Sequence, residues 1–373
     1  MITLPKRKGA VLTDSQLEDL RAKKALALPA KYLQPGGFDL PIGTTAYQAS
    51  CIPSLAQGFD GKNFIKNYCH STHDLKDGSI VLMPGINYLV KIQCALDLPK
   101  TIVGYSNPKS SAGRCDLDCT LLAEGGTEYN VIPAGYKGSL YLLVSAQSFP
   151  VILRPGDTLM QIRLFKGVRD ILTGVQLKKI HQEDPLVSGT LKPVFTNEGI
   201  LLHLDLTGAP SNLVSIPNGR PLDLAERQSI DPTDYFREKR LERDGSLMLE
   251  PHEFVLATTK ERLRILPWMS TEMVPYTEKQ GPFRSHFAGY FDPGFGYDEQ
   301  DTQGSGVVLE IRNLTDRRLQ FADGQGVCLM RYESVSQIPS RLYGEQSSKV
   351  AELSHYQFQT GIKLAKYFKN WPE

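Results

Sequence analysis

Residues 291–313, FDPGFGYDEQDTQGSGVVLEIRN, hold the pattern from which the fold can be worked out. A turn rich in Gly, Pro and Asp leads through a polar loop into the apolar run 306–311, and a β-branched run that begins at a Gly is typical of a strand. Glu310 is unusual there, because it shares one strand face with Val308, and carboxylates are seldom buried unless paired. Glu310 is therefore either a solvated edge residue or a carboxylate held in a pocket.

The chain repeats itself with an offset of about 167 residues. The motifs that recur in nearly one register are 38–40 with 204–206, 81–84 with 248–251, 98–99 with 266–267, 138–141 with 306–309, and 154–156 with 322–324. Short apolar runs alternate with Gly, Pro, Asn and Asp clusters, which favours an all-β fold over an α/β sheet. We predict a mainly β protein of two tandem, distorted β-barrel or jelly-roll modules with short helices.

Composition indicates where the modules begin and end. Residues 1–30 form an N-terminal arm, in which a capping-box pattern at Thr13 predicts a short helix. Residues 31–176 form the first module, 177–191 a polar linker, and 192–373 the second module. The charged stretch 222–243 is interpreted as a helical insertion, and a C-terminal tail closes the chain.

Charge and cysteine usage bound the function. The net charge is +1 with acids and bases mixed, so nucleic acid is not an expected partner. No apolar run is long enough for a membrane span, and the N-terminus lacks the apolar core of a secretory signal. Six irregularly spaced cysteines are typical of reduced thiols. We therefore expect a cytoplasmic protein that does not bind a membrane.

The two copies differ at three places. Residues 107–114, NPKSSAGR, place two hydroxyls between cations and can bind phosphate oxygens, whereas residues 277–279 of the second copy carry a carboxylate there. Asp292-Pro293-Gly294 aligns with Glu124-Gly125-Gly126, and Glu310 aligns with Leu142. The differences are largely reciprocal, which predicts one site composed from both modules. Asp39 and Asp205 are interpreted as strand or turn residues without a catalytic role.

These motifs resemble those of the deoxycytidine triphosphate (dCTP) deaminases of the deoxyuridine triphosphatase (dUTPase) superfamily, in a tandem form. The family's Arg-Ser-Ser-Leu-Ala-Arg loop is similar to residues 109–114, and its Asp-Pro-Gly-aromatic turn and Leu-Glu strand are similar to 292–295 and 306–310. Its C-terminal Tyr-Gln motif resembles residues 356–361, and its Arg-Pro-Gly turn resembles 154–156. The resemblance implies two dUTPase-like modules.

The resemblance also implies the roles of individual residues. Glu310 would be the general base for water that attacks C4 of cytosine, with Arg114 and Ser110 near that water. Lys109, Ser111 and Gln359 would bind the triphosphate, and Asp292 would contact the deoxyribose hydroxyl. The backbone near His286 and Ala288 would read the base edge. Tyr343 and Tyr356 would close over the nucleotide. Mg²⁺ would arrive on the phosphates, with no protein metal site and no zinc.

The sequence departs from the family pattern in several places. Lys109 replaces an Arg and so loses a bidentate fork. The strand at 306–310 is one residue shorter between Gly and Leu, and Phe358 replaces a Gly. Family members form closed threefold rings, which implies a homo-oligomer, but two unlike modules cannot alternate around a ring of three.

Other functions remain open. A dUTPase would use Asp292 to activate water, although the Gly-rich tail of those enzymes is absent, and a bifunctional enzyme would carry out both steps. A zinc-dependent deaminase needs His-x-Glu and Pro-Cys-x-x-Cys, and the sequence has neither. A duplicated module that binds nucleotide without turnover is a further alternative. Measured turnover would separate these hypotheses.

Overall fold

The chain divides into two compact units. The computed structural model describes residues 9–76, 78–276, 283–285, 289–345 and 355–372. Residues 6–169 and 217–227 make the first unit, and residues 170–216 and 228–373 the second. The helical elements are α1 Asp14–Ala22, η1 Ala30–Tyr32, α2 Gly61–Tyr68, α3 Ser110–Gly113, α4 Gly174–Glu183 and η2 Pro232–Asp234. None of the described helices is long and apolar enough to cross a membrane.

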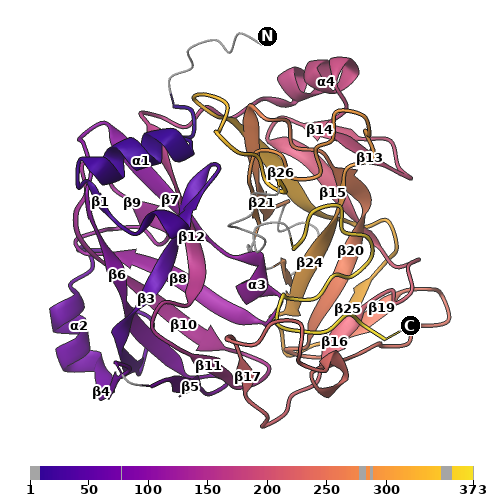
Figure 1. Cartoon of the computed structure of the whole chain (residues 1–373). Helices are drawn as coiled ribbons and strands as arrows, with labels where there is room; N and C mark the ends of the chain where they lie inside the picture. Colours follow the sequence, from indigo (N-terminus) through magenta and orange to yellow (C-terminus); the bar gives the residue numbers. More distant parts are fainter. Residues whose placement is uncertain (1–8, 77, 277–282, 286–288, 346–354, 373) are drawn as a thin grey trace. The chain divides into compact units, whose positions relative to one another are not determined.

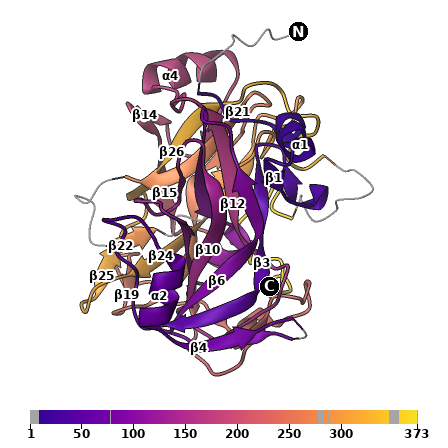
Figure 2. The same ribbon diagram turned by 90° about the vertical axis from the view of Figure 1, so that its left-hand side faces the viewer.

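The first unit is built on one large sheet with the strand order β8-β10-β6-β3-β12-β7-β9 (Figure 1). Its strands are β1 Leu26–Ala27, β2 Leu33–Gln34, β3 Gly37–Ala49, β4 Cys69–Asp74, β6 Asn87–Asp97, β7 Ile102–Pro108, β8 Leu117–Ala123, β9 Val131–Ile132, β10 Lys137–Ala146 and β12 Thr158–Lys166. A small sheet holds β5 Ile80–Leu82 and β11 Val151–Leu153. Helix α1 lies beside β1 in both views of the ribbon (Figure 2).

The second unit has the matching order β22-β24-β20-β15-β26-β21-β23. Its strands are β13 Val187–Gly189, β14 Val194–Thr196, β15 Gly199–Asp205, β16 Leu213–Ser215, β18 Phe236–Arg237, β20 Phe254–Leu263, β21 Met269–Pro275, β22 Phe283–Ser285, β23 Tyr290–Phe291, β24 Ser305–Asn313 and β26 Gly326–Ser334. Strands β19 Leu247–Leu249 and β25 Leu319–Phe321 repeat the small sheet. The predicted fold class and the tandem repeat are confirmed.

The segment expected to be a linker is part of the second unit. Residues 177–183 lie in helix α4 and residues 187–189 form strand β13, and α4 begins with the same capping box as α1. In α4 the Thr173 backbone N–H donates to the Gln176 side chain over 2.8 Å. The polar residues that suggested a linker lie on the solvent side of this helix, whereas Leu177 is buried.

The ladders of the two units correct one sequence alignment. Leu89 pairs with Leu143, and the equivalent pair 167 positions later is Leu256 with Glu310 (89 to 256 and 143 to 310). Both ladders also carry the same irregularity, between 139 and 141 and between 306 and 308. Leu143, and not Leu142, therefore stands where the second unit has Glu310. The sequence alignment was wrong by one residue because it matched Gly138 with Gly306.

A second alignment is also corrected. Strand β9 pairs with β7 as β23 pairs with β21, so Asp292-Pro293-Gly294 corresponds to Pro133-Ala134-Gly135 rather than to Glu124-Gly125-Gly126. The segment before β9 is longer than the one before β23, which displaced the alignment. Two matching hydrogen bonds support the new assignment, Leu98 N to Tyr136 O and Ile265 N to Phe295 O, both 2.8 Å.

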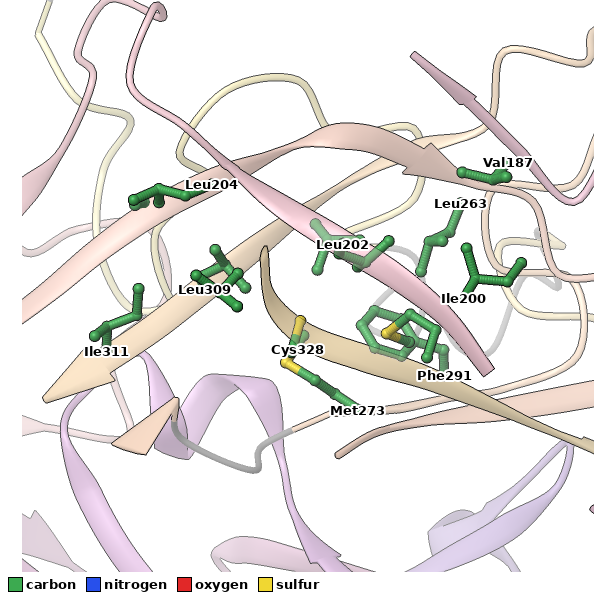
Figure 3. Close-up of a cluster of buried hydrophobic side chains, with 14 of the residues drawn as sticks. Val187, Ile200, Leu202, Leu204, Leu263, Met273, Phe291, Leu309, Ile311 and Cys328 are labelled. Carbon is green, nitrogen blue, oxygen red and sulfur yellow. The ribbon is translucent and has the colours of Figure 1, made fainter. Parts of the chain in front are cut away.

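The core of the second unit explains which side of β24 carries the carboxylate. Val307, Leu309 and Ile311 alternate along β24 into a buried cluster with residues of β15, β20 and β26 (Figure 3). Because side chains alternate along a strand, Val308 and Glu310 lie on the opposite face. The prediction that Val308 and Glu310 share one face of the strand is therefore confirmed.

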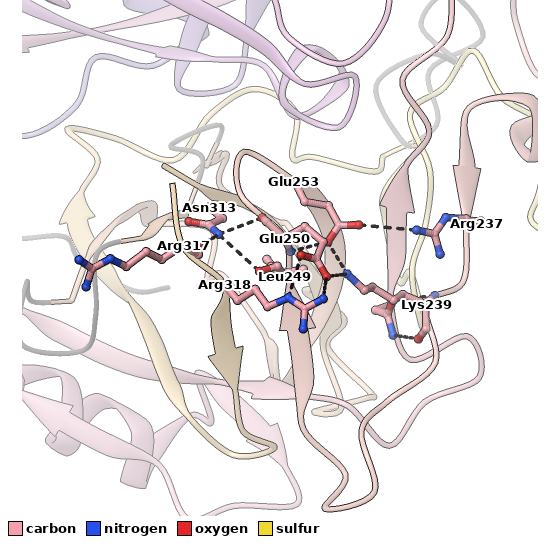
Figure 4. Close-up of polar contacts among 9 residues, drawn as sticks. Arg237, Lys239, Leu249, Glu250, Glu253, Asn313, Arg317 and Arg318 are labelled. Atoms are coloured by element: carbon pink, nitrogen blue, oxygen red, sulfur yellow. Dashed lines mark hydrogen bonds and ion pairs between the residues drawn. The ribbon is translucent and has the colours of Figure 1, made fainter. Parts of the chain in front are cut away.

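A polar network holds the end of β24. The Asn313 side chain donates to the Glu250 backbone oxygen over 2.9 Å and to the Arg317 backbone oxygen over 2.7 Å, while the Glu250 carboxylate pairs with Arg318 at 2.8 Å (Figure 4). Lys239 donates to Glu253 over 2.6 Å beside this pair. The network fixes where β24 ends and therefore the register in which Glu310 faces β20.

The stretch interpreted as a helical insertion contains no α-helix, and it has a counterpart in the first unit. Residues 222–243 contain β17 Leu222–Asp223, the 3-10 turn η2, which begins at Pro232, and β18. Strand β16 pairs with β20 as the end of β3 pairs with β6, and β18 follows β16 as β4 follows β3. Residues 216–235, which connect β16 with β18, are thus the counterpart of residues 50–68, which connect β3 with β4.

Candidate active site

The phosphate-binding loop predicted in the first unit forms a single helical turn. Pro108 ends β7, and the small residues that follow allow helix α3 to begin directly after Lys109. The Lys109 backbone N–H donates to the Leu159 oxygen over 2.8 Å, which ties the turn to β12, and Arg114 N donates to Ser110 O over 3.0 Å. Ser111 and Arg114 are buried, at 4% and 3% exposure. The predicted loop residues are thus fixed against the sheet.

Lys109 does not extend freely into solvent. Its ammonium group forms an ion pair with Asp39 on β3 and donates to the Thr158 hydroxyl over 3.2 Å. The Gln34 side-chain amide donates to the same carboxylate over 3.2 Å. Lys109 is therefore held by side chains of β3 and β12, and Gln34 of β2 bonds to the Asp39 carboxylate that holds it.

Glu310 lies on the non-core face of β24, with only 3% of its surface exposed. It is opposite Leu256 of β20, and the next residue on this face, Arg312, lies over the Phe254 ring at 5.9 Å. The face of β24 that carries Glu310 therefore holds a buried carboxylate and, two residues further on, a guanidinium group.

Asp292 follows β23 in a tight turn and is 6% exposed. Gly294 adopts φ +95°, and a Cβ there would lie 2.6 Å from the Leu342 Cβ, so only glycine fits. The Tyr343 backbone N–H donates to the Pro293 oxygen over 2.8 Å, and the Tyr343 ring lies 5.6 Å from that of Phe295. Tyr343 is therefore attached to the turn that carries Asp292.

The C-terminal motif lies along the beginning of β24. Gln359 is 5% exposed, its side-chain amide donates to the Gly306 oxygen over 2.7 Å, and Gly306 N donates to Gln359 O over 2.9 Å. Ser305 Oγ donates to the Tyr356 backbone oxygen over 3.3 Å. Two residues expected to contact substrate, Tyr356 and Gln359, are thus bonded to the strand that carries Glu310.

Sequence reasoning missed Gln357. Its side-chain amide donates to the backbone oxygens of Gly294 (2.9 Å) and Tyr343 (3.2 Å) and accepts from the Gly296 N–H over 2.8 Å. One side chain therefore ties the tail to the Asp292 turn and to Tyr343. Its place between Tyr356 and Gln359 in the tail motif was the signal that could have identified it.

Hydrogen bonds thus connect four predicted residues within the second unit, namely Asp292, Tyr343, Tyr356 and Gln359. Their tail segment bonds to the beginning of β24, the strand that also carries Glu310. Lys109, Ser110, Ser111 and Arg114 lie together in the first unit. His286 and Ala288 lie outside the described residues. Among the residues that are described, no group of three or more His, Cys, Asp and Glu side chains is arranged to hold a metal ion.

Family profiles match both parts of the chain. The profile of the 2'-deoxycytidine 5'-triphosphate deaminase N-terminal domain matches residues 8–168, and that of the C-terminal domain matches residues 173–368. A solved structure described as 2'-deoxycytidine 5'-triphosphate deaminase from Agrobacterium tumefaciens superposes with a TM-score of 0.83 and 31% identity, over 91% of this chain and 99% of that one.

Curated relatives match over a shorter length. A protein of Methanosphaera stadtmanae named "dCTP deaminase, dUMP-forming" is 31% identical over 146 residues, which cover 37% of this chain and 68% of that protein. A protein of Natronomonas pharaonis named "dCTP deaminase" is 28% identical over 139 residues, covering 36% of this chain and 63% of its own. Each alignment is about the length of one module.

Proposed function

The chain belongs to the 2'-deoxycytidine 5'-triphosphate deaminase family, and we propose that it hydrolyses dCTP to dUTP and ammonia, in the supply of pyrimidine deoxynucleotides. One observation supports this reaction above the others. Glu310 is a buried carboxylate on the non-core face of β24, at a position where the otherwise equivalent strand of the first unit has Leu143. A fold that needs only an apolar residue there gives no reason for an acid.

In the proposed reaction Glu310 is the general base. It takes one proton from water as the oxygen attacks C4 of cytosine and passes it to the ring nitrogen N3. The second proton of that water, now on the C4 hydroxyl, then passes to the departing amino group. The C4–N4 bond breaks, ammonia leaves, and the base becomes uracil. Ser110 and Arg114 are proposed to lie near the attacking water, with the charged guanidinium stabilising negative charge that develops on oxygen.

Binding of the substrate is assigned to the remaining polar residues. Lys109, Ser111 and Gln359 are proposed to hold the triphosphate, Asp292 the deoxyribose hydroxyl, and Tyr343 and Tyr356 the outer side of the nucleotide. The backbone near His286 and Ala288 is proposed to read the base edge. Mg²⁺ enters on the phosphates, where it neutralises charge, and the chemistry at C4 requires no metal held by side chains. A cytoplasmic homo-oligomer completes the proposal.

The alternative product is dUMP. The name of the Methanosphaera stadtmanae relative, "dCTP deaminase, dUMP-forming", favours a second hydrolytic step after deamination. In that case Asp292 would activate a water for attack on the phosphate chain, and pyrophosphate would be released. A protein that binds dCTP without turnover would contradict both versions.

The test is release of ammonia from dCTP by purified protein with Mg²⁺, with nucleotides separated by chromatography. Wild type is expected to form dUTP, and Glu310→Gln is expected to lose activity while remaining folded. Asp205→Asn removes another carboxylate of the second unit, one that pairs with Lys260, and serves as the matched control. Pyrophosphate and dUMP from wild type would establish the alternative, and full activity of Glu310→Gln would remove the assigned base.

The proposal that both modules contribute to one site needs a test of its own. Ser110→Ala/Arg114→Ala and Glu310→Gln proteins would each be inactive, and mixing them is expected to restore activity if residues of different chains complete one site and subunits exchange. A solved complex with a dCTP analogue that leaves Arg114 remote from every Glu310 would contradict the proposal.

A further inference from the structure

The environment of Lys109 is more restrictive than a phosphate-binding lysine requires. An ammonium group has three N–H donors on a flexible stem and ordinarily acts as a point charge without a fixed direction. Within the part of the chain that the structure describes, Asp39 and Thr158 accept two of these donors. The Asp39 side chain is 8% exposed and that of Lys109 is 20% exposed, so the pair is largely shielded from water. The remaining donor has a defined direction.

The second unit shows that the fold does not need this network. Met160 pairs with Leu40 and with Pro108, and its counterpart Cys328 pairs with Leu202 and with Pro275. The same ladders therefore place Leu201 at the position of Asp39, Tyr276 at that of Lys109, and Gly326 at that of Thr158. All three members of the network are absent together from a unit with the same strand order.

We propose that Asp39 and Thr158 are positioning residues that direct the third N–H of Lys109 toward the phosphate chain of the substrate. This inference rests on the proposed function. Arg would supply a planar fork with its own direction, whereas Lys gains direction only from groups that hold its other donors. The neighbouring hydroxyls of Ser110 and Ser111 make the same turn suited to phosphate oxygens. Asp39 thus acts through Lys109 without touching the nucleotide.

The test is a double-mutant cycle on nucleotide binding. In a Glu310→Gln background, which prevents turnover, calorimetry measures the Kd for dCTP with Asp39→Asn, Lys109→Met and both together. Asp39→Asn is expected to raise the Kd about tenfold, and to have no further effect once Lys109 is Met, because its effect passes through the ammonium group. With Glu310 intact, Asp39→Asn should raise KM by a similar factor and change kcat less than twofold.

Two further variants complete the test. Asp205→Asn removes a carboxylate that pairs with Lys260 in the second unit and is expected to leave the Kd unchanged. Thr158→Val removes the second acceptor and should raise the Kd about threefold, which keeps the inference testable if Lys109→Met does not fold. Unchanged or tighter binding with Asp39→Asn, or effects that add fully in the double variant, would overturn it. Wild-type turnover independently tests the proposed function, so the two failures are distinguishable.

Discussion

Two connections of similar length, residues 50–68 and 216–235, occupy the same place in the topology of the two modules and fold differently. In the first unit the connection turns back on its own sheet. Phe59 and Phe64 join Leu89 and Leu143 in one buried cluster, and the Phe59 ring lies 5.6 Å from that of Tyr141. The non-core face of β10, which carries Leu143, is therefore covered by residues 50–68 of the same unit.

The later connection follows another course. Its residues 217–227 belong to the first unit, where β17 pairs in parallel with β11 and Leu222 is fully buried. Within residues 216–235 the only helical element is the 3-10 turn η2, so this connection has no α-helix corresponding to α2. The two equivalent strands thus differ in both respects: β10 has Leu143 in an apolar cluster with its own connection, whereas β24 has the buried carboxylate of Glu310.

Glu310→Leu makes the second strand resemble the first and should have the largest effect. If Glu310 is the general base, as proposed, its loss is expected to lower kcat by about 10²- to 10⁴-fold. The stability should be unchanged or higher, because replacing a buried ionisable group with an apolar one is often neutral or favourable. Ammonia release and thermal unfolding measure the two quantities. A large fall in the melting temperature would assign Glu310 a structural role.

Leu143→Glu is the reciprocal change. A carboxylate without a partner in the cluster of Phe59 and Phe64 should cost about 3–5 kcal/mol of unfolding free energy, measured with urea. Because burial raises the pKa of the new carboxyl, the loss should be larger at pH 8 than at pH 5. Leu143→Met is the control, expected to cost less than about 1.5 kcal/mol. A stable Leu143→Glu protein would show that this face tolerates charge in both units.

Leu222→Ala tests the strand that the later connection adds to β11. Deletion of a fully buried leucine side chain should cost about 2–5 kcal/mol in urea unfolding. Leu319→Ala is the matched control, because β25 is the counterpart of β11 and Leu319 is only partly buried there. Equal losses at the two positions would mean that β17 contributes little.

Gln357→Ala should loosen the Asp292 turn, which the first unit replaces with Pro133-Ala134-Gly135. Loss of three hydrogen bonds to Gly294, Gly296 and Tyr343 is expected to lower kcat/KM about tenfold, about 1.4 kcal/mol. Gln320→Ala, at a side chain that bonds to Asp244 and Ser246, is the control. Unchanged kinetics would show that the tail does not position the turn.

Asp223→Asn should have the smallest effect. The hydrogen-bonded Arg154 side chain lowers the pKa of Asp223 below its ordinary value of 3.8, so the ion pair contributes stability above that value and loses it as the pH falls toward the lowered pKa. Because both side chains are partly exposed, the cost at pH 7 should be less than about 1 kcal/mol. Urea unfolding at pH 7 and pH 3 measures it, and an equal cost at both would contradict the ion-pair explanation.

The sequence predicted the repeat, the β class and the motifs because these depend on local patterns. Apolar alternation and turn residues specify strands, and Thr13 specifies the helix that follows it. The resemblance supplied the roles of the site residues, which stay predictions. Asp292 and Glu310 stood out because a charged residue beside apolar ones is visible without tertiary information.

The alignment errors concerned strand register, which is determined by the pairing of strands and not by local sequence patterns. Matching Gly138 to Gly306 gave a register wrong by one residue, which moves a side chain to the other face of a strand. The match of Asp39 with Asp205 was also wrong, since the strand pairings of the two units make Leu201, and not Asp205, the residue equivalent to Asp39. The link between Asp39 and Lys109 joins residues far apart in sequence, and no local pattern announces it.

Strand β17 has a consequence for how such a chain could have evolved. Duplicated modules are ordinarily separable units of inheritance, because recombination at the repeat boundary leaves each copy whole. Here a cut near residue 170 would separate the first unit from residues 217–227, which complete its small sheet. Cut there, the first half would lose β17 and the second half would carry β17 without its partner β11, so the two halves are inherited intact only as one unit.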